Sequence, residues 1–137
     1  MKLKLIMLVS LFAFGFALNA NAGAVADGDS DLVPDAFDNC VARANGPGQG
    51  SNQVDADLDG YGNACDSDYN QDNATTTLDF STFLNAFTGA VPNLETDHNG
   101  DGATTTLDFS RFLADFQTLV PPGPSGLACA GTIPCTP

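Results

Sequence analysis

The segment 97–108 carries oxygen-bearing side chains at its first, third, fifth, ninth and twelfth positions. They are Asp97, Asn99, Asp101, Thr105 and Asp108. The sixth position, where a loop around an ion must turn sharply, is Gly102, and the seventh, Ala103, offers a backbone carbonyl. Calcium is bound by oxygen ligands at this spacing in EF-hand-type loops. The segment therefore predicts a calcium loop, although Asp108 is one methylene shorter than the glutamate that usually occupies the twelfth position.

The same spacing occurs three more times, and we number the loops 1 (27–38), 2 (55–66), 3 (68–79) and 4 (97–108). The expected ligands of loop 1 are Asp27, Asp29, Asp31, the carbonyl of Val33, Asp35 and Asp38. Those of loop 2 are Asp55, Asp57, Asp59, the carbonyl of Tyr61, Asn63 and Asp66. Those of loop 3 are Asp68, Asn70, Asp72, the carbonyl of Ala74, Thr76 and Asp79.

Nearly all the acidic residues belong to these loops, since of the 17 only Glu95 and Asp115 lie outside them. A merely solvated or disordered acidic chain would not place its carboxylates in ligand register. The sequence therefore predicts about four calcium ions per chain, and no other cofactor.

Residues 1–22 have the pattern of a secretory signal peptide. Lys2 and Lys4 precede the apolar run 5–18, and Ala20-Asn21-Ala22 offers a small-residue cleavage site. The alternative, a membrane anchor, is disfavoured because the run is short for a bilayer, and no later stretch is apolar enough to span one. Cleavage after Ala22 removes two lysines and takes the formal charge from −13 to −15. We expect a secreted, extracellular or cell-surface protein that does not bind nucleic acid.

The four cysteines are expected to form disulfides, because the chain is exported and its N-terminal part has few core-forming residues. Three pairings are possible, and we favour the two local ones, Cys40 with Cys65 and Cys129 with Cys135. Zinc binding is the alternative. It is disfavoured because the sequence has no C-x-x-C motif and its only histidine is His98.

Residues 27–66 resemble thrombospondin type 3 repeats. The resemblance rests on Asp-x-Asp-x-Asp spacings followed by Asp38-Asn39-Cys40 and by Asn63-Ala64-Cys65-Asp66. It implies a chain that wraps around calcium ions with almost no regular secondary structure. Two features depart from the family. Leu32 stands where loop 1 would normally have glycine, and the glycine-rich segment 43–51 is expected to be an inserted flexible loop.

Residues 68–89 and 97–118 are an internal duplication with 14 identities in 22 positions. Each copy continues from its loop into an apolar pattern at helical spacing. The residues are Phe80, Phe83, Leu84 and Phe87 in the first copy, and Phe109, Phe112, Leu113 and Phe116 in the second. The pattern predicts two helices that pack face to face. The threonine triplets 75–77 and 104–106 are β-branched, which favours a short strand pairing between the two loops.

The repeat unit is a loop followed by a helix, because loop 3 begins two residues after loop 2 ends and residues 89–93 contain helix-breaking Gly and Pro. This arrangement resembles the dockerin family, whose paired calcium loop–helix repeats bind cohesin modules. The resemblance implies a cohesin-like partner contacted by the tenth and eleventh loop positions. These are Thr77, Leu78, Thr106 and Leu107. The two leucines have an alternative role as core residues. Asn73 replaces the glycine at the sixth position of loop 3 but tolerates a positive φ.

No arrangement of residues in the sequence indicates an enzyme. His98 occupies the second loop position, which normally points outward, so we expect it to be solvated, and the paired carboxylates are already explained as calcium ligands.

The predicted organisation has four parts. They are a signal peptide (1–22), thrombospondin type 3-like repeats (23–66), a mainly α-helical dockerin-like module (67–120), and a Pro/Gly linker with a cysteine-containing tail (121–137). The predicted function is that of a non-catalytic adaptor for a cohesin-type partner in a surface or polysaccharide-related assembly. The alternative is a calcium-rigidified structural or adhesive protein that contacts a cell-surface or matrix component.

Overall fold

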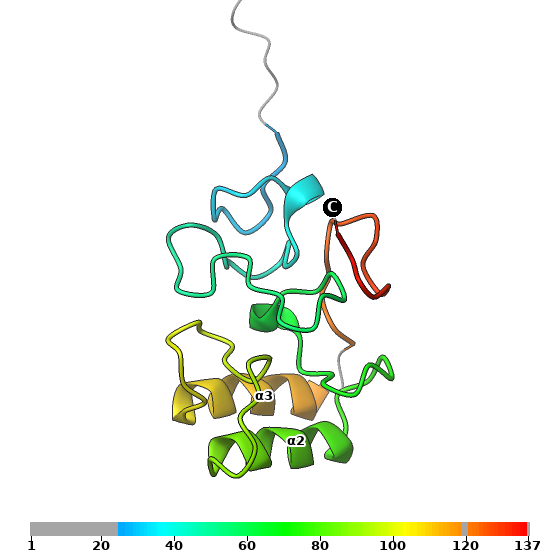
Figure 1. Cartoon of the computed structure of the whole chain (residues 1–137). Coiled ribbons are helices and arrows are strands. Elements are labelled where there is room, and N and C mark those ends of the chain that lie inside the picture. Colours follow the sequence, from blue (N-terminus) through cyan, green and yellow to red (C-terminus); the bar gives the residue numbers. More distant parts are fainter. Residues whose placement is uncertain (1–24, 119–120, 137) are drawn as a thin grey trace, which may run out of the picture.

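The computed structural model describes residues 25–118 and 121–136, so the predicted signal peptide lies outside the described residues. Two helices lie side by side at one end of the molecule (Figure 1). Irregular chain, residues 25–66, forms the other end, and the C-terminal tail runs back beside it. Within the described ranges, no helix is long and apolar enough to cross a membrane.

The regular elements are few and short. The 3-10 helices η1 (Asp35–Phe37) and η2 (Asn63–Cys65) end loops 1 and 2. The α-helices α2 (Thr77–Phe87) and α3 (Thr106–Thr118) follow loops 3 and 4. Each α-helix begins where a loop threonine caps it. Thr76 Oγ1 accepts a hydrogen bond from the Leu78 amide, and Asp79 accepts one from the Thr76 amide, which completes a capping box.

The phenylalanines hold α2 and α3 together, as the helical spacing predicted. The Phe83 and Phe112 side chains are fully buried, with ring centroids 5.2 Å apart. Phe80 approaches Phe116, and Phe87 approaches Phe109, each at 6.2 Å, so the two helices run antiparallel. Stacked and tilted aromatic pairs at such distances stabilise a core beyond the burial of their area. Leu84 and Leu113, which were expected on the same face, remain partly exposed at its edge.

The strand pairing expected from the threonine triplets is wrong, since the structure has no β-strand in residues 25–118 and 121–136. The backbone at Thr76 and Thr105 instead serves the helix starts. Both amides donate to the aspartate that ends their loop, at 2.7 Å each. The Thr104 hydroxyl lies 2.6 Å from the Thr96 hydroxyl. A residue whose amide caps a helix cannot also donate to a strand ladder.

The N-terminal part has little apolar core, and polar groups fill its interior. Its buried apolar cluster consists of Cys40, Ala64 and Cys65, and the disulfide Cys40–Cys65 runs through it. Around this cluster the Asn39 amide donates to Gln53 Oε1 at 2.9 Å, and Gln53 Nε2 donates to Asp38 at 2.8 Å. A network of satisfied buried amides replaces the apolar packing that a segment of this length lacks.

The segment 43–51, expected to be a flexible inserted loop, is anchored to loop 1 through Asn45, while its residues 47–50 are exposed. Asn45 is fully buried and Ser51 almost so. The Asn45 amide donates to the Asp31 carboxylate at 2.8 Å, and the Gln53 amide donates to the Asn45 carbonyl at the same distance. The glycines in this segment permit close approach, because a Cβ at Gly46 would lie 2.3 Å from the Asp31 carbonyl oxygen.

The tail is bound to the N-terminal part rather than extended as a linker. The Gly123 amide donates to the Cys65 carbonyl at 3.0 Å, and the Cys135 amide donates to the Leu58 carbonyl at 2.6 Å. Its disulfide joins Cys129 to Cys135, so both expected pairings are confirmed. The tail therefore covers loop 2, as its course in Figure 1 suggests.

Candidate metal centre

The first aspartate of every loop accepts hydrogen bonds from amides of its own loop. Its carboxylate oxygens lie 2.6–3.2 Å from two or three of the amides at the fourth, fifth and sixth positions. These aspartates are Asp27, Asp55, Asp68 and Asp97. Amide donors around a carboxylate fix its orientation, so each loop is closed on its first expected ligand.

The four loops also share a backbone conformation. At both the fourth and the sixth position of every loop, φ is positive. The residues are Ser30, Leu32, Leu58, Gly60, Gln71, Asn73, Gly100 and Gly102. Four of these are neither Gly nor Asn, and such residues rarely adopt a positive φ. Leu32, with φ 79°, turns loop 1 as glycine turns loops 2 and 4. The departure at Leu32 has therefore not changed the course of the loop.

In loops 1 and 2 the first three aspartates come together. Each of Asp27, Asp29 and Asp31 has a carboxylate oxygen within 4.8 Å of the others, and so do Asp55, Asp57 and Asp59. Both carboxylate oxygens of Asp29 are buried and have no hydrogen-bond partner. The same holds for Oδ2 of Asp38, the last expected ligand of the same loop. Buried carboxylate oxygens without donors are costly. Oxygen donors of this charge fit a hard divalent cation such as calcium, whose binding would satisfy them.

Several carboxylates of loops 1 and 2 have a pKa above the ordinary value of an aspartate. Burial, then the charges of Asp31 and Asp38, raises the pKa of Asp29. Burial, together with the charges of Asp57, Asp55 and Asp68, raises the pKa of Asp59 to about 6, although the Tyr61 amide opposes the shift. Burial raises the pKa of Asp66, at the end of loop 2, to about 9. A divalent cation bound beside these carboxylates would favour their charged forms and so oppose these shifts.

Loops 3 and 4 are organised differently. Their three aspartates do not form a cluster as tight as those of loops 1 and 2 in the part of the chain that the structure describes. The last aspartates, Asp79 and Asp108, are fully buried and accept hydrogen bonds from their own loops and from the threonines that cap the helices. The hydroxyls of Thr76 and Thr105 donate to these aspartates at 3.1 and 2.9 Å.

The remaining expected ligands lie within their loops. Asn70 and Asn99 accept hydrogen bonds from the amides of Asp72 and Asp101 at 3.0 and 2.9 Å. At the ninth position of loops 1 and 2, Asp35 and Asn63 accept from the amides of Gly28 and Ala56. The amides of the four residues expected to offer carbonyls each donate to the preceding aspartate of their loop; these residues are Val33, Tyr61, Ala74 and Ala103.

The expectation that His98 is solvated is wrong, because its side chain is only 4% exposed. Its Nδ1 lies 2.5 Å from the Asn63 carbonyl, and its Nε2 lies 2.9 Å from the Tyr69 hydroxyl. The second position of loop 4 therefore points inward, toward η2 and loop 3. Burial lowers the pKa of His98, so the ring is neutral at pH 7. It acts as a structural contact between the two halves.

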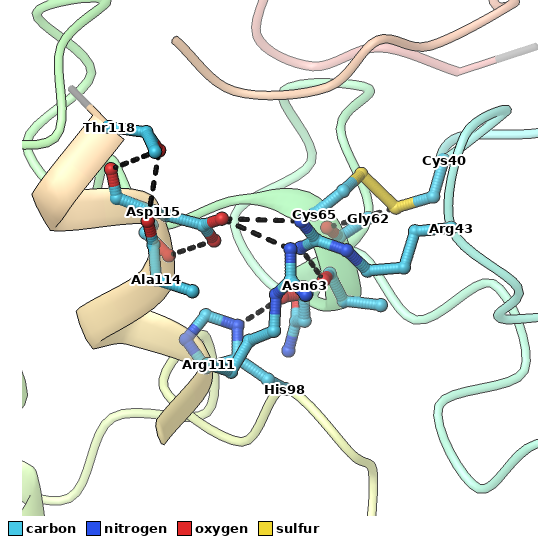
Figure 2. A network of polar contacts seen from close by, with 12 residues as sticks. Cys40, Arg43, Gly62, Asn63, Cys65, His98, Arg111, Ala114, Asp115 and Thr118 are labelled. Atoms are coloured by element: carbon cyan, nitrogen blue, oxygen red, sulfur yellow. Dashed lines mark hydrogen bonds and ion pairs between the residues drawn. A yellow bond between two sulfur atoms is a disulfide. The ribbon is translucent and has the colours of Figure 1, made fainter. Parts of the chain in front are cut away.

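Asp115 is a key residue that sequence reasoning missed. Its carboxylate is buried and lies 3.2 Å from Arg43 and 3.0 Å from Arg111, and it accepts a hydrogen bond from Ser67 (Figure 2). Arg43 also donates to the Ala64 carbonyl. The network joins α3 to the N-terminal part across the boundary expected near residue 66. One signal was available, because Asp115 interrupts the duplication, in which Ala86 holds the equivalent place.

The residues expected to contact a partner lie at the starts of α2 and α3. Leu78 is 63% exposed and Leu107 is 66% exposed, so neither is a core residue. Thr77 and Thr106 precede them as the first residues of the helices. Their surroundings differ, because Leu107 borders a cavity shared with the N-terminal part.

No family model, curated protein or solved structure matches this chain.

Proposed function

We propose that this chain is an exported, non-catalytic calcium-binding module. The observation that carries the proposal is Asp29, whose two buried carboxylate oxygens have no donor and lie beside Asp27 and Asp31. The shared positive φ values support extending the assignment to all four loops. Calcium would be held by the carboxylates of each loop, joined by asparagine side chains and by the carbonyl at the seventh position.

Calcium in this proposal supplies much of the free energy of folding. The loops hold 15 of the 17 acidic residues, and the N-terminal part has almost no apolar core to oppose their repulsion. Each ion contributes about 2.7 kcal/mol when calcium is at a hundred times its dissociation constant. Several such contributions are comparable with the stability of a small domain, about 5–15 kcal/mol.

Circular dichroism and limited proteolysis with and without a chelator test this role. We expect cleavage in residues 25–66 to begin when calcium is removed, before cleavage in the phenylalanine-packed helices. A chelated chain that keeps its native spectrum and resists protease would show that calcium does not hold the fold together.

We further propose that calcium orders the chain as an adaptor for a cohesin-type partner. This step is supported by the exposed leucines Leu78 and Leu107 at duplicate positions. A panel of purified cohesin modules tests it, with the double variant Leu78→Ser/Leu107→Ser compared with Leu94→Ser, an exposed leucine between the repeats. Docking that depends on calcium and on the two helix-start leucines, and not on Leu94, is the expected result. Absence of docking to every module would favour a different role.

That different role is a calcium-rigidified structural or adhesive protein. It is favoured by the contacts that join both halves and the tail into one unit, above all Asp115 with Arg43. In this case calcium would change the stiffness of the chain without creating a docking surface.

A further inference from the structure

Asn63, the expected ligand at the ninth position of loop 2, is contacted by residues that lie outside its own loop. Its Nδ2 donates a hydrogen bond to the Leu94 carbonyl at 2.7 Å. Its backbone carbonyl accepts one from Nδ1 of His98 at 2.5 Å (Figure 2). Leu94 and His98 stand on either side of Asp97, the first expected ligand of loop 4. The side chain and the backbone of one expected ligand are therefore both fixed by the segment 94–98, in which loop 4 begins.

These contacts are shielded from water, because Asn63 is only 3% exposed and His98 only 4%. Polar groups buried to this degree depend on their protein partners, since water cannot replace a bond that is lost. The Oδ1 atom of Asn63 accepts a hydrogen bond from the Ala56 amide at 2.9 Å, which directs this oxygen into loop 2. The asparagine side chain thus joins loop 2 through its oxygen and the segment 94–98 through its nitrogen.

The ninth-position side chains of the other loops bond within their own loops in the part of the chain that the structure describes. Asp35 accepts a hydrogen bond from the Gly28 amide. The hydroxyls of Thr76 and Thr105 each donate to the aspartate that ends the same loop. Asn63 is therefore the ninth-position residue whose placement depends on another loop.

The partner residue His98 lies between two expected ligands of loop 4, Asp97 and Asn99. An ion held by these two side chains would order the backbone on both sides of His98, and with it the contact to the Asn63 carbonyl. A segment that is already ordered has less conformational entropy to lose when a second site is filled, which gives positive coupling without a change of fold.

We propose that Asn63 and His98 couple loops 2 and 4, so that each loop binds calcium more tightly when the other is occupied. The inference rests on the proposed calcium-binding function and states how two of its sites regulate each other. Coupling between binding sites is reciprocal and is usually worth about 5–150-fold in affinity. Because only two buried hydrogen bonds join the loops here, we expect the lower end of this range, roughly fivefold.

Nuclear magnetic resonance titration of the ¹⁵N-labelled chain with calcium tests the coupling loop by loop. The sixth-position amides of loops 2 and 4, Gly60 and Gly102, donate to the first aspartate of their loops and so report occupancy. Asp101→Ala removes a ligand from loop 4 and should raise the calcium concentration that half-saturates the Gly60 signal. Asp59→Ala, the matched change in loop 2, should raise that of the Gly102 signal. Since coupling is reciprocal, the loop that fills later in the parent chain should show the full factor, roughly fivefold.

Substitutions of the two rings separate this coupling from a general loss of stability. Tyr69→Phe removes only the hydroxyl beside Nε2 of His98, so the effect of Asp101→Ala on loop 2 should persist in that background. His98→Asn retains a side-chain N–H donor for the Asn63 carbonyl and should preserve the effect as well. His98→Phe retains a ring without a donor, so the effect should disappear. If His98→Phe does not fold, the reciprocal pair of aspartate variants still tests the coupling.

Three outcomes would contradict the proposal, and they can be told apart. Saturable shifts of Gly60 and Gly102 whose midpoints do not change in Asp101→Ala and Asp59→Ala would overturn the coupling and leave the calcium-binding function standing. An undiminished effect in the His98→Phe background would show that Asn63 and His98 do not carry it. The absence of any saturable shift with calcium would contradict the calcium-binding function itself, and the coupling with it.

Discussion

The Tyr69 hydroxyl lies 2.9 Å from Nε2 of His98, although the two residues hold the same position in the two copies of the repeat. The Asn63 carbonyl can only accept a hydrogen bond, so Nδ1 of His98 carries the ring proton and Nε2 accepts the tyrosine hydrogen. A histidine at the second position of a calcium loop thus becomes a link between loop 3, loop 4 and η2.

This link predicts a pH dependence. Burial lowers the pKa of His98 below its ordinary value of 6.5, so the unfolded chain binds more protons than the folded one just below that pH. In saturating calcium, the contribution of His98 to the free energy of unfolding should be complete above pH 6.5 and should diminish as the pH falls below it. Thermal unfolding of the parent chain and His98→Gln across this range measures the difference. A His98 ring that titrates at or above 6.5 in a nuclear magnetic resonance experiment would contradict the account.

Asp115 and Glu95 are the two acidic residues outside the loops, and we expect their substitution to affect stability very differently. Asp115→Ala leaves Arg43, Arg111 and Ser67 without their shared partner. We expect a loss of roughly 2 kcal/mol, less than for a fully buried pair, because the arginine side chains remain about 30% exposed. Glu95→Gln should cost almost nothing, because burial and nearby aspartates raise the pKa of Glu95. Chemical denaturation compares the two, and equal stability of both variants would show that the Asp115 network does not hold the halves together.

Gly60 and Gly102 form a matched pair at the sixth position of loops 2 and 4. Their φ values are nearly equal, at 91° and 92°. A Cβ at Gly102 would meet nothing within 4 Å, whereas one at Gly60 would lie 2.6 Å from Cys135 Sγ and 2.8 Å from Ala130 Cα. Gly102→Ala should therefore cost only backbone strain, about 1–2 kcal/mol, and Gly60→Ala should cost more and displace the tail. Denaturation combined with protease cleavage of the tail distinguishes them, and an undisturbed tail in Gly60→Ala would refute the packing described.

Without calcium, the stability of the chain should increase as the pH falls from 9 to 7. Burial raises the pKa of Asp66 from 3.8 to about 9, so without metal the folded state holds a proton that the unfolded state has lost. The free energy of unfolding should therefore rise as the pH falls from 9 to 7, a range above the titration of His98. Asp66→Asn should remove this slope and stabilise the chelated chain at pH 9, while weakening calcium binding. A chelated parent chain whose stability is flat across this range would contradict the assignment.

The features that follow local rules were predictable from the sequence. The phenylalanine spacing predicted the two helices and their packing, and the locality of the cysteine pairs predicted both disulfides. Loop register predicted the aspartate clusters of loops 1 and 2, because ligand spacing is itself a local property.

The features that depend on distant contacts were not predictable. The inward position of His98 depends on η2, which lies 35 residues earlier in the sequence at Asn63. Asp115 meets Arg43 across 72 residues, and nothing in their local sequence pairs them. The threonine triplets were assigned by strand propensity, but their capping bonds to Asp79 and Asp108 decided the outcome.

The number of calcium ions bound by the folded chain tests the central claim most directly. Extracellular modules bind calcium at about 10⁻⁴–10⁻³ M, so native mass spectrometry in millimolar calcium should resolve the occupied species. The account predicts four ions on the parent chain and three on Asp29→Ala, because that variant removes the aspartate whose buried oxygens have no other partner. Two ions or fewer on the parent chain, or the same number on Asp29→Ala, would contradict it.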